Sequence, residues 1–381
     1  VTGTGQHLVY DFELNYPFGM RNARPPLYDW SVAVSGMALD ILGMSLEDGI
    51  GYSLVFSTAV WGALTVIPVF MMASSLFGRR AGLLSAFLFA LMPGHIERSI
   101  FSNADHDAMV LFFVVFAFYF FLRSLQTIEG TKWVADWKDR KTVLPGLRSY
   151  FNQNQVSMLY AALGGVCVSA VGMIWTGYTY ILIIILVYYI AQLFIDRFKS
   201  SDSMGVVISV MTMWLVAFAI MAPLYYQMDY WYVWFDMPFI LLMIGFVVGI
   251  LFITTRDYPW VLMVPVILGI AAISLVVMWL ITPQIFNAVI SGQGYLVKSK
   301  LYSTISEAQA PSFSNLVMSF GALTFWLALF GVGYAAVKIP RSSSPHFVFM
   351  VIYGAVSIYM AASAGRFLFN AAPAFALLGG W

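Results

Sequence analysis

The chain has 381 residues, of which 61% are hydrophobic, 17% aromatic and only 10% charged, and its net charge is +1. Soluble domains carry roughly 25% charged residues. The net charge says nothing about partners, but the sequence lacks the basic footprint of nucleic-acid binding, so no nucleic-acid partner is expected. The single cysteine, Cys167, excludes an intramolecular disulfide and a cysteine metal cluster. The composition therefore predicts an integral membrane protein whose first partner is the lipid bilayer.

The first 51 residues contain one apolar stretch, residues 28–45, which is interrupted by Asp29 and Asp40. Crossing the bilayer would bury both acids without an obvious partner, and this is costly. If residues 28–45 did cross, Arg21 and Arg24 would move to the cytoplasmic side, which the distribution of basic residues also permits. We prefer a helix on the outer surface and assign residues 1–51 to part of a first outer loop, and residues 52–381 to a multi-span transmembrane domain.

Eleven apolar segments follow in chain order, and most have the roughly 17–25 residues that a membrane-spanning helix needs. The second segment is short and is expected to extend into its flanks. The predicted fold is an all-α polytopic membrane protein with about 11 spans and long outer loops. The predicted spans are 52–77, 81–94, 108–124, 157–174, 179–195, 205–223, 237–254, 260–282, 314–337, 346–363 and 366–381.

Basic residues are shared unequally between the two sides of the membrane. If the spans alternate and Asp105 lies outside, 13 of the 19 Lys and Arg residues fall on the opposite side. That side is the cytoplasm by the positive-inside rule. The loop 125–155 then lies in the cytoplasm. It is polar and carries Trp133 and Trp137 four residues apart, which is typical of an interfacial helix.

The same alternation brings distant polar residues to one face. An even number of predicted spans separates the outer loop 94–107 from the outer loop 283–313, and again separates the latter from the final span. The residues that share this outer face are Arg98, Asp105, Asp107, Glu307 and Arg366.

Asp105 and Asp107 are the strongest candidates for a functional site. A charged residue within the membrane costs about 2.5–3.5 kcal/mol, and hard carboxylate oxygens suit a divalent cation. The alternative is helix capping, for which one acid suffices. Residues two apart on an ideal helix point about 200° away from each other. Both acids therefore share a cation only if Asp105 precedes the first helical turn.

The other candidates are weaker when each is taken alone. Arg98 has the alternative of a surface arginine whose head reaches water. Arg366 begins an apolar segment on the outer side, where a guanidinium fork suits a phosphate. Glu307 lies in a small, polar loop segment and has the alternative of a solvated glutamate. The four histidines are scattered and predict no metal triad.

Several short motifs, in this order, resemble the catalytic subunit of oligosaccharyltransferases (the STT3/AglB/PglB family), and most closely its archaeal AglB branch. Asn103-Ala-Asp105-His-Asp107 matches the family's second DxD motif, with Arg98 at the expected upstream spacing. The other matching segments are Tyr16-Pro-Phe-Gly with Arg24-Pro-Pro-Leu-Tyr-Asp29-Trp, the TIxE motif Thr304-Ile-Ser-Glu307, the RFxxxxxP segment Gly365-Arg366-Phe-Leu-Phe-Asn-Ala-Ala-Pro373 and, more weakly, Trp175-Thr-Gly-Tyr178.

The resemblance implies a GT-C type transmembrane domain and covers nearly the whole chain. The family's first DxD motif would precede Val1, and its Trp-Trp-Asp motif and soluble carboxy-terminal domain would follow Trp381. The chain is therefore expected to be inactive by itself.

The implied reaction moves an oligosaccharide from a dolichyl phosphate or diphosphate carrier to asparagine in the Asn-X-Ser/Thr sequence of an acceptor polypeptide. The resemblance implies catalytic roles for Glu307, Asp105 and Arg98, and Mn²⁺ or Mg²⁺ as cofactor. It assigns the metal to Asp105, Asp107 and Glu307, and the lipid phosphate and substrate to Arg366, Arg98 and Tyr178. The enzyme would lie in the cell membrane as a multi-pass protein, with its active site on the extracytoplasmic face.

Two alternatives stay open. Another GT-C transferase, such as a protein O-mannosyltransferase, would share the multi-span body and acidic outer loops, but the TIxE and RF segments argue against it. An ion-coupled transporter would place charges near the membrane midplane, often in repeated halves. In this sequence the charges lie at the ends of the spans and no repeat is visible.

Overall fold

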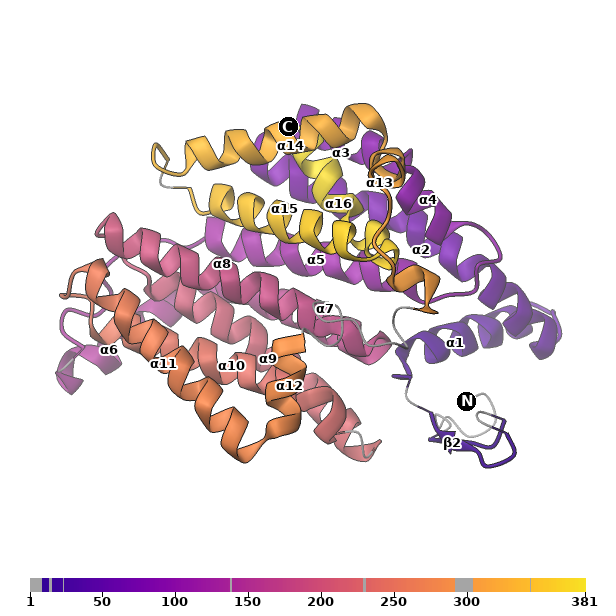
Figure 1. Cartoon of the computed structure of the whole chain (residues 1–381), viewed down its shortest axis with the longest axis horizontal. Helices are drawn as coiled ribbons and strands as arrows, with labels where there is room; N and C mark the ends of the chain where they lie inside the picture. The colour runs from indigo at the N-terminus through magenta and orange to yellow at the C-terminus, as the bar shows by residue number, and fades with distance from the viewer. Residues whose placement is uncertain are drawn as a thin grey trace.

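The computed structural model describes residues 9–13, 16–22, 24–137, 139–228, 231–291, 304–342 and 344–381. These residues form a bundle of helices that run mostly along one common direction (Figure 1). Near the amino terminus, β1 (Tyr10–Asp11) and β2 (Met20–Arg21) form a short antiparallel pair in which Tyr10 lies opposite Arg21.

The helices follow one another with short connections. The first half contains α1 (Leu27–Ile41), α2 (Leu46–Phe77), α3 (Arg79–Ala90), α4 (Pro93–Ser99), α5 (Asp107–Gln126), α6 (Arg140–Gln153), α7 (Gln155–Ile174), η1 (Thr176–Tyr178) and α8 (Thr179–Phe198). The second half contains α9 (Met204–Gln227), α10 (Trp231–Thr254), α11 (Trp260–Ile281), α12 (Pro283–Ser291), η4 (Ser306–Ala308), α13 (Phe313–Phe320), α14 (Ala322–Lys338), α15 (His346–Ser363), η5 (Gly365–Phe367) and α16 (Leu368–Gly379).

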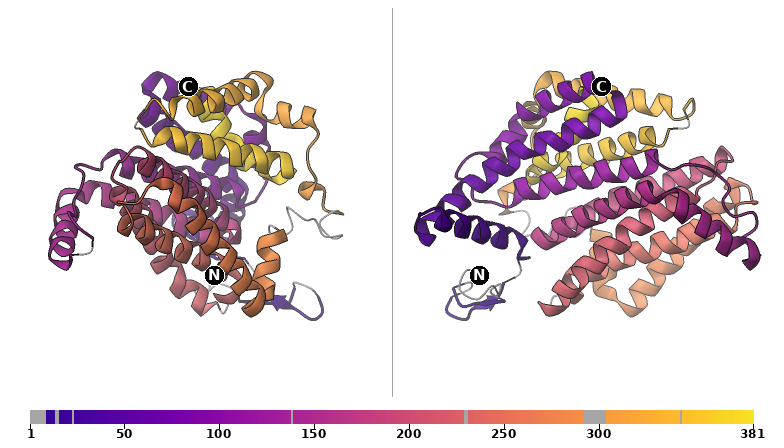
Figure 2. Two further views of the ribbon diagram at one scale, coloured as in Figure 1. Left: turned by 60° about the vertical axis from the view of Figure 1, so that its left-hand side comes forward. Right: turned by 180° about the vertical axis from the view of Figure 1, so that it is seen from behind.

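The helices arrange around α5. Helices α8 to α11, pink to orange, form one side of the bundle, and α14 to α16, orange to yellow, form the other (Figures 1 and 2). Helix α5 packs against α2 and α7, and its side chains Leu111, Phe118 and Phe121 are fully buried. The apolar pattern of α5 therefore forms the centre of the core.

Eight of the described helices are long and apolar enough to cross a membrane, and a ninth crossing results if the bent pair α13 and α14 counts as one. This confirms an all-α, multi-pass membrane protein but does not confirm the eleven predicted spans. The predicted spans 81–94 and 366–381 correspond to α3, which begins earlier at Arg79, and to α16, each of 12 residues. Such a helix is about 18 Å long, shorter than the roughly 30 Å hydrocarbon layer.

The predicted span 314–337 is broken near its start. Helices α13 and α14 meet at an angle of 92° at Gly321, whose φ is +76°. Glycine adopts this backbone conformation without the steric cost that a side chain imposes. The bend brings α13 against α4, where the carbonyl of Ser319 approaches Gly94. This contact holds the start of α4, the helix that carries Arg98.

The amino-terminal boundary differs from the prediction. Helix α2 begins at Leu46, because the Oγ atom of Ser45 caps the helix by accepting a hydrogen bond from the Asp48 amide at 3.2 Å. The predicted division between residues 51 and 52 therefore lies inside α2. Helix α1 is a separate element of 15 residues, and its position on the outer membrane surface stays a prediction.

The loop 125–155 contains one helix, α6, but Trp133 and Trp137 precede it in non-helical backbone, and an interfacial position of this helix stays a prediction. Trp133 and Trp137 pack against a small buried cluster that is separate from the main core and consists of Val134, Tyr150 and Met204. The rings of Trp133 and Tyr150 meet edge to face at 5.7 Å. The loop is therefore packed against the start of α9.

Helices α7 and α9 approach closely at Gly165. A Cβ atom built there would lie 2.4 Å from the carbonyl oxygen of Met213, so no side chain fits without a shift of one helix. We expect Gly165→Ala to lower the free energy of unfolding by about 1–3 kcal/mol, the usual cost of overpacking. The measurement is thermal unfolding in detergent. Gly269→Ala is the matched control, because a Cβ there meets nothing within 4 Å. Equal melting temperatures for the two variants would contradict the close contact.

Candidate functional site

The acid pair lies in the loop between α4 and α5. The backbone of this loop is unusual, since Ser102 and Ala104 have φ angles of +72° and +46°. Non-glycine residues rarely adopt such angles, and those that do concentrate at functional sites. Helix α5 begins at Asp107, with His106 as its N-cap. Asp105 therefore precedes the first helical turn. The two aspartates can share a cation only in this arrangement.

Asp105 is held from two sides. Its backbone contacts the hydroxyl of Thr58 on α2, which donates to the Asp105 carbonyl at 3.2 Å and lies 3.4 Å from the Asp105 amide nitrogen. Its Oδ1 atom accepts the backbone N–H of His106 at 2.7 Å and lies 2.8 Å from His106 Nδ1. The hydrogen bond from the imidazole, helped by the charge of Arg98, lowers the pKa of Asp105 below its ordinary value despite partial burial. Asp105 is therefore a carboxylate at neutral pH.

His106 is a candidate that sequence reasoning missed. One ligand atom from each of Asp105, His106 and Asp107 lies within 4.8 Å of the others. The Nε2 atom of His106 is buried without a hydrogen-bond partner and lies 3.9 Å from Asp107 Oδ1. An imidazole whose Nδ1 is bound by a carboxylate and whose Nε2 is open is the usual arrangement of a metal-ligating histidine. In the sequence, the position of His106 between two aspartates could have indicated this role.

Arg98 connects the acid pair to the distant outer loop. Its Nη2 atom donates to Glu307 Oε1 at 2.9 Å, and its Nη1 atom lies 3.7 Å from Asp107 Oδ2. Burial lowers the pKa of Arg98, but the hydrogen bond and charge of Glu307, with the charges of both aspartates, outweigh burial and raise it overall. The guanidinium thus stays charged between two acids.

Glu307 pairs with Arg98, and its assignment as a metal ligand stays a prediction. Its carboxylate is paired with Arg98 and is half-exposed, with 50% of the side-chain surface open to solvent. The three-residue group that could hold a cation consists of Asp105, His106 and Asp107 in the described part of the chain. The predicted metal set of Asp105, Asp107 and Glu307 is therefore not brought together as one cluster.

Arg366 lies on a short turn that is fastened to the turn of Glu307. The Gly365 amide donates to the Gln309 carbonyl at 2.9 Å, which joins η5 to η4. Arg366 is also near enough to Asp107 to act on it electrostatically. Residues more than 200 positions apart thus converge at one end of the helical bundle, as the alternation of spans predicts.

Tyr178 lies in η1 with a side chain that is fully buried, and its ring is 6.4 Å from the ring of Tyr225. A buried ring offers no surface to a lipid carrier in this conformation. Its role in substrate binding stays a prediction, whereas its packing between α7, α8 and α9 is visible in the structure.

The sequence of this chain matches those of known proteins. The family model described as oligosaccharyl transferase STT3, N-terminal, matches residues 3–380. Dolichyl-phosphooligosaccharide-protein glycotransferase 1 of Archaeoglobus fulgidus is 30% identical over 115 residues, which are 30% of this chain and 18% of that protein. These two matches come from sequence alone.

Solved structures show the same fold. The archaeal oligosaccharyltransferase AglB from Archaeoglobus fulgidus, in complex with an inhibitory peptide and a dolichol-phosphate, matches with a TM-score of 0.81 and 20% identity, over 100% of this chain and 44% of that one. The oligosaccharyltransferase of the same organism in complex with Zn and sulfate matches with a TM-score of 0.65 and 20% identity, over 100% of this chain and 42% of that one.

This chain spans less than half the length of each of these proteins, with 18%, 44% and 42% of them matched. Since the family model covers nearly every residue of the sequence, this chain belongs to the oligosaccharyl transferase STT3 family.

Proposed function

We propose that this chain forms the membrane part of an enzyme that transfers an oligosaccharide from a dolichyl phosphate or diphosphate carrier to the asparagine of Asn-X-Ser/Thr in an acceptor polypeptide. The observation that carries the proposal is the position of Arg98, which joins Glu307 to Asp107 beside the group Asp105, His106 and Asp107. Membership of the family and the dolichol-phosphate bound to the related AglB support it.

The chemical difficulty is that an amide nitrogen is a poor nucleophile. Its lone pair is delocalised into the carbonyl, and the rotation barrier of about 18–20 kcal/mol measures that delocalisation. A carboxylate that accepts the amide N–H would hold the nitrogen toward the sugar carbon and favour its lone pair. Glu307 suits this role because Arg98 fixes its Oε1 atom while half of the side chain faces solvent, from which the acceptor arrives.

The carrier phosphate needs positive charge at the outer ends of the helices. A guanidinium fork binds phosphate oxygens with two parallel hydrogen bonds, and it would stabilise the negative charge that grows on the departing phosphate. Arg366 provides this fork next to Glu307, because η5 is hydrogen-bonded to the η4 turn. Arg98 adds a second positive charge on the other side of Glu307. Tyr178 would act indirectly, by fixing the ends of the neighbouring helices.

Asp105, His106 and Asp107 would hold Mn²⁺ or Mg²⁺. The buried, unpartnered Nε2 atom of His106 supports a bound cation, and the mixed oxygen and nitrogen donors favour Mn²⁺ over Mg²⁺. When bound, such a cation supplies Lewis-acid stabilisation of phosphate oxygens. The chain itself contributes the rigid placement of the donors, since Thr58 holds the Asp105 backbone and His106 orients the Asp105 carboxylate.

The excess of basic residues opposite Asp105 supports a location of the active site on the extracytoplasmic face of the cell membrane. A site at the membrane edge also suits the two substrates. The lipid tail of the carrier stays in the bilayer while its phosphate and glycan reach the water, where the acceptor peptide is.

The proposal is tested with the complete protein in membranes, a lipid-linked glycan and two fluorescent peptides. One peptide carries Asn-X-Thr and the other has glutamine in place of asparagine. A glycan added to the first peptide alone supports transfer to asparagine. Glycan on both peptides, attached at threonine, would favour an O-glycosyltransferase. Modification of neither peptide by a protein that still moves ions across vesicles would favour a transporter.

The contact between Thr58 and Asp105 gives a prediction of its own. Thr58→Val removes the hydroxyl that bonds the Asp105 backbone while nearly preserving shape. We expect Mn²⁺ affinity to fall about tenfold, because groups that orient metal ligands usually affect affinity by this amount or more. Calorimetric titration with Mn²⁺ measures it. Thr65→Val on the same helix is the control, since Thr65 bonds only its own helix at Trp61. Equal affinities in both variants would refute the support role.

A further inference from the structure

A polar cavity lies far from the candidate site. It has a volume of about 630 Å³, within the range of small-ligand pockets, and is formed by the α8–α9 connection, the α10–α11 connection and the loop before α6. These connections lie at the end of the bundle near α6, whereas α1 and α4 lie at the other end (Figure 1). The cavity thus faces the membrane side opposite Asp105.

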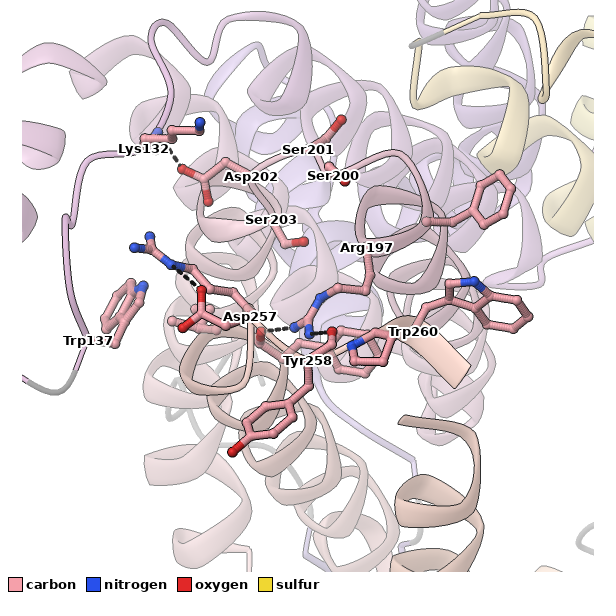
Figure 3. Close-up of a pocket in the computed structure, with 15 residues that line it drawn as sticks. Lys132, Trp137, Arg197, Ser200, Ser201, Asp202, Ser203, Asp257, Tyr258 and Trp260 are labelled. Atoms are coloured by element: carbon pink, nitrogen blue, oxygen red, sulfur yellow. Dashed lines mark hydrogen bonds and ion pairs between the residues drawn. The ribbon is translucent and has the colours of Figure 1, made fainter. Parts of the chain in front are cut away.

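Three cations line this cavity, namely Lys132, Arg197 and Arg256. Figure 3 labels Lys132 and Arg197. The Nη1 atom of Arg197 donates to the carbonyl oxygens of Thr255 and Tyr258 at 2.5 and 2.9 Å, and its Nη2 atom donates to the carbonyl of Phe252. These contacts hold the end of α10 but do not cancel the charge. Among the described residues, neither Arg197 nor the Lys132 ammonium has a carboxylate at ion-pair distance, although the charge of Asp257 acts on Arg197.

The two acids in the cavity wall are already engaged. Both oxygens of Asp202 accept backbone amides, from Lys132 at 2.6 Å and from Met204 at 3.0 Å. Asp257 lies 3.8 Å from Nε of Arg256, and its side chain is 80% exposed. The formal charge of the lining residues is +1, from three cations and two carboxylates. The lining of the cavity therefore carries a small net positive charge.

The cavity also sits where an interfacial lipid would be. Its wall includes Trp137, Tyr258 and Trp260, and aromatic residues of this kind gather at membrane–water boundaries. Trp260 begins α11, and only 6% of the apolar stretch of this helix is buried inside the protein. A molecule with its polar end in the cavity would therefore find an uncovered apolar helix directly beside it.

We propose that this cavity binds the phosphate of an anionic lipid head group from the leaflet opposite the candidate site. Basic pockets at the ends of membrane-spanning helices recognise such head groups, because the cations meet the phosphate while the acyl chains stay in the bilayer. Ser200 and Ser201 line the same cavity and supply hydroxyl donors. The shared chemistry is that of a phosphate, and free inorganic phosphate is the other source to be separated from the lipid.

The test uses the full protein, stripped of lipid in detergent and titrated with phosphatidylglycerol or phosphatidylcholine, with bound lipid counted by native mass spectrometry. The variant is Lys132→Gln, and the matched control is Lys141→Gln, an exposed lysine on α6 that does not line the cavity. We expect a preference for phosphatidylglycerol that falls about fivefold in Lys132→Gln, the effect of losing one cation near a lipid phosphate. Lys141→Gln should bind as the parent does.

A parallel titration with inorganic phosphate identifies the source. Competition by inorganic phosphate, without any preference for phosphatidylglycerol over phosphatidylcholine, would overturn the lipid and assign the cavity to free phosphate. Equal binding of the two lipids with no effect of phosphate, or equal losses in both lysine variants, would overturn the proposal altogether. The melting temperature of Lys132→Gln should match the parent, since its side chain is exposed.

Discussion

Glu307→Gln is expected to lower transfer to an Asn-X-Thr peptide by about 100- to 1000-fold, the usual effect of removing one group that stabilises a transition state. Glutamine keeps the length of the side chain but removes the negative charge. The amide of the acceptor then loses a charged hydrogen-bond acceptor, and Arg98 loses the carboxylate at 2.9 Å. The measurement is the initial rate of peptide glycosylation by the complete protein.

Two controls separate this role from a general loss of folding. Glu97→Gln removes an exposed carboxylate from α4, the helix that carries Arg98, and should leave the rate unchanged. Binding of the lipid carrier to Glu307→Gln should persist, because Arg366 and Arg98 retain their charges. A rate near that of the parent in Glu307→Gln would remove Glu307 from the mechanism.

Asp105→Asn should abolish the metal-dependent part of the activity, again by about 100-fold or more, since a metal that stabilises phosphate charge contributes several kcal/mol. Asparagine preserves the shape of Asp105 and can still accept from His106, so the loop should keep its conformation. What is lost is the anionic charge, which the hydrogen bond from His106 stabilises in the parent.

The readout for this variant is activity as a function of added Mn²⁺. The control is Asp40→Asn, an exposed acid on α1 with no side-chain contact in the described part of the chain. A variant that needs much more Mn²⁺, or cannot be saturated, supports the ligand assignment. Full activity of Asp105→Asn at the Mn²⁺ demand of the parent would exclude it.

Much of the candidate site could be predicted from the sequence because charge is so costly in a membrane. The few charged residues at the ends of apolar spans were visible, and counting spans placed Glu307 and Arg98 on one face. The structure joins them at 2.9 Å across 209 residues of sequence. The multi-pass helical fold followed from composition in the same way.

The rest depended on three-dimensional details that hydropathy does not encode. Helices α3 and α16 have only 12 residues each, and hydropathy alone does not show where a helix ends, so the count of eleven spans is not confirmed. His106 was missed because its role depends on the loop backbone, where positive φ angles at Ser102 and Ala104 precede the helix start. Burial of Tyr178 and the pairing of Glu307 with Arg98 likewise arise from packing between distant helices.

The two ends of the bundle also differ in how they use arginine. At the outer end, Arg98 pairs with carboxylates, so its charge is locally balanced until substrate arrives. At the other end, Arg197 bonds carbonyl oxygens rather than a carboxylate, in a cavity whose lining carries a net charge of +1. Balanced charge suits a site that must exchange partners during turnover, whereas unbalanced charge suits a site that retains an anion.

The most direct test of the central claim is the mass of a fluorescent Asn-X-Thr peptide incubated with membranes that contain the complete protein and a lipid-linked glycan. The incubation is carried out with chelator, without chelator, and with chelator followed by Mn²⁺. We predict a glycan mass gain on asparagine that chelator abolishes and Mn²⁺ restores. No mass gain with a competent carrier, or a gain that chelator leaves unchanged, would contradict metal-dependent transfer to asparagine at this site.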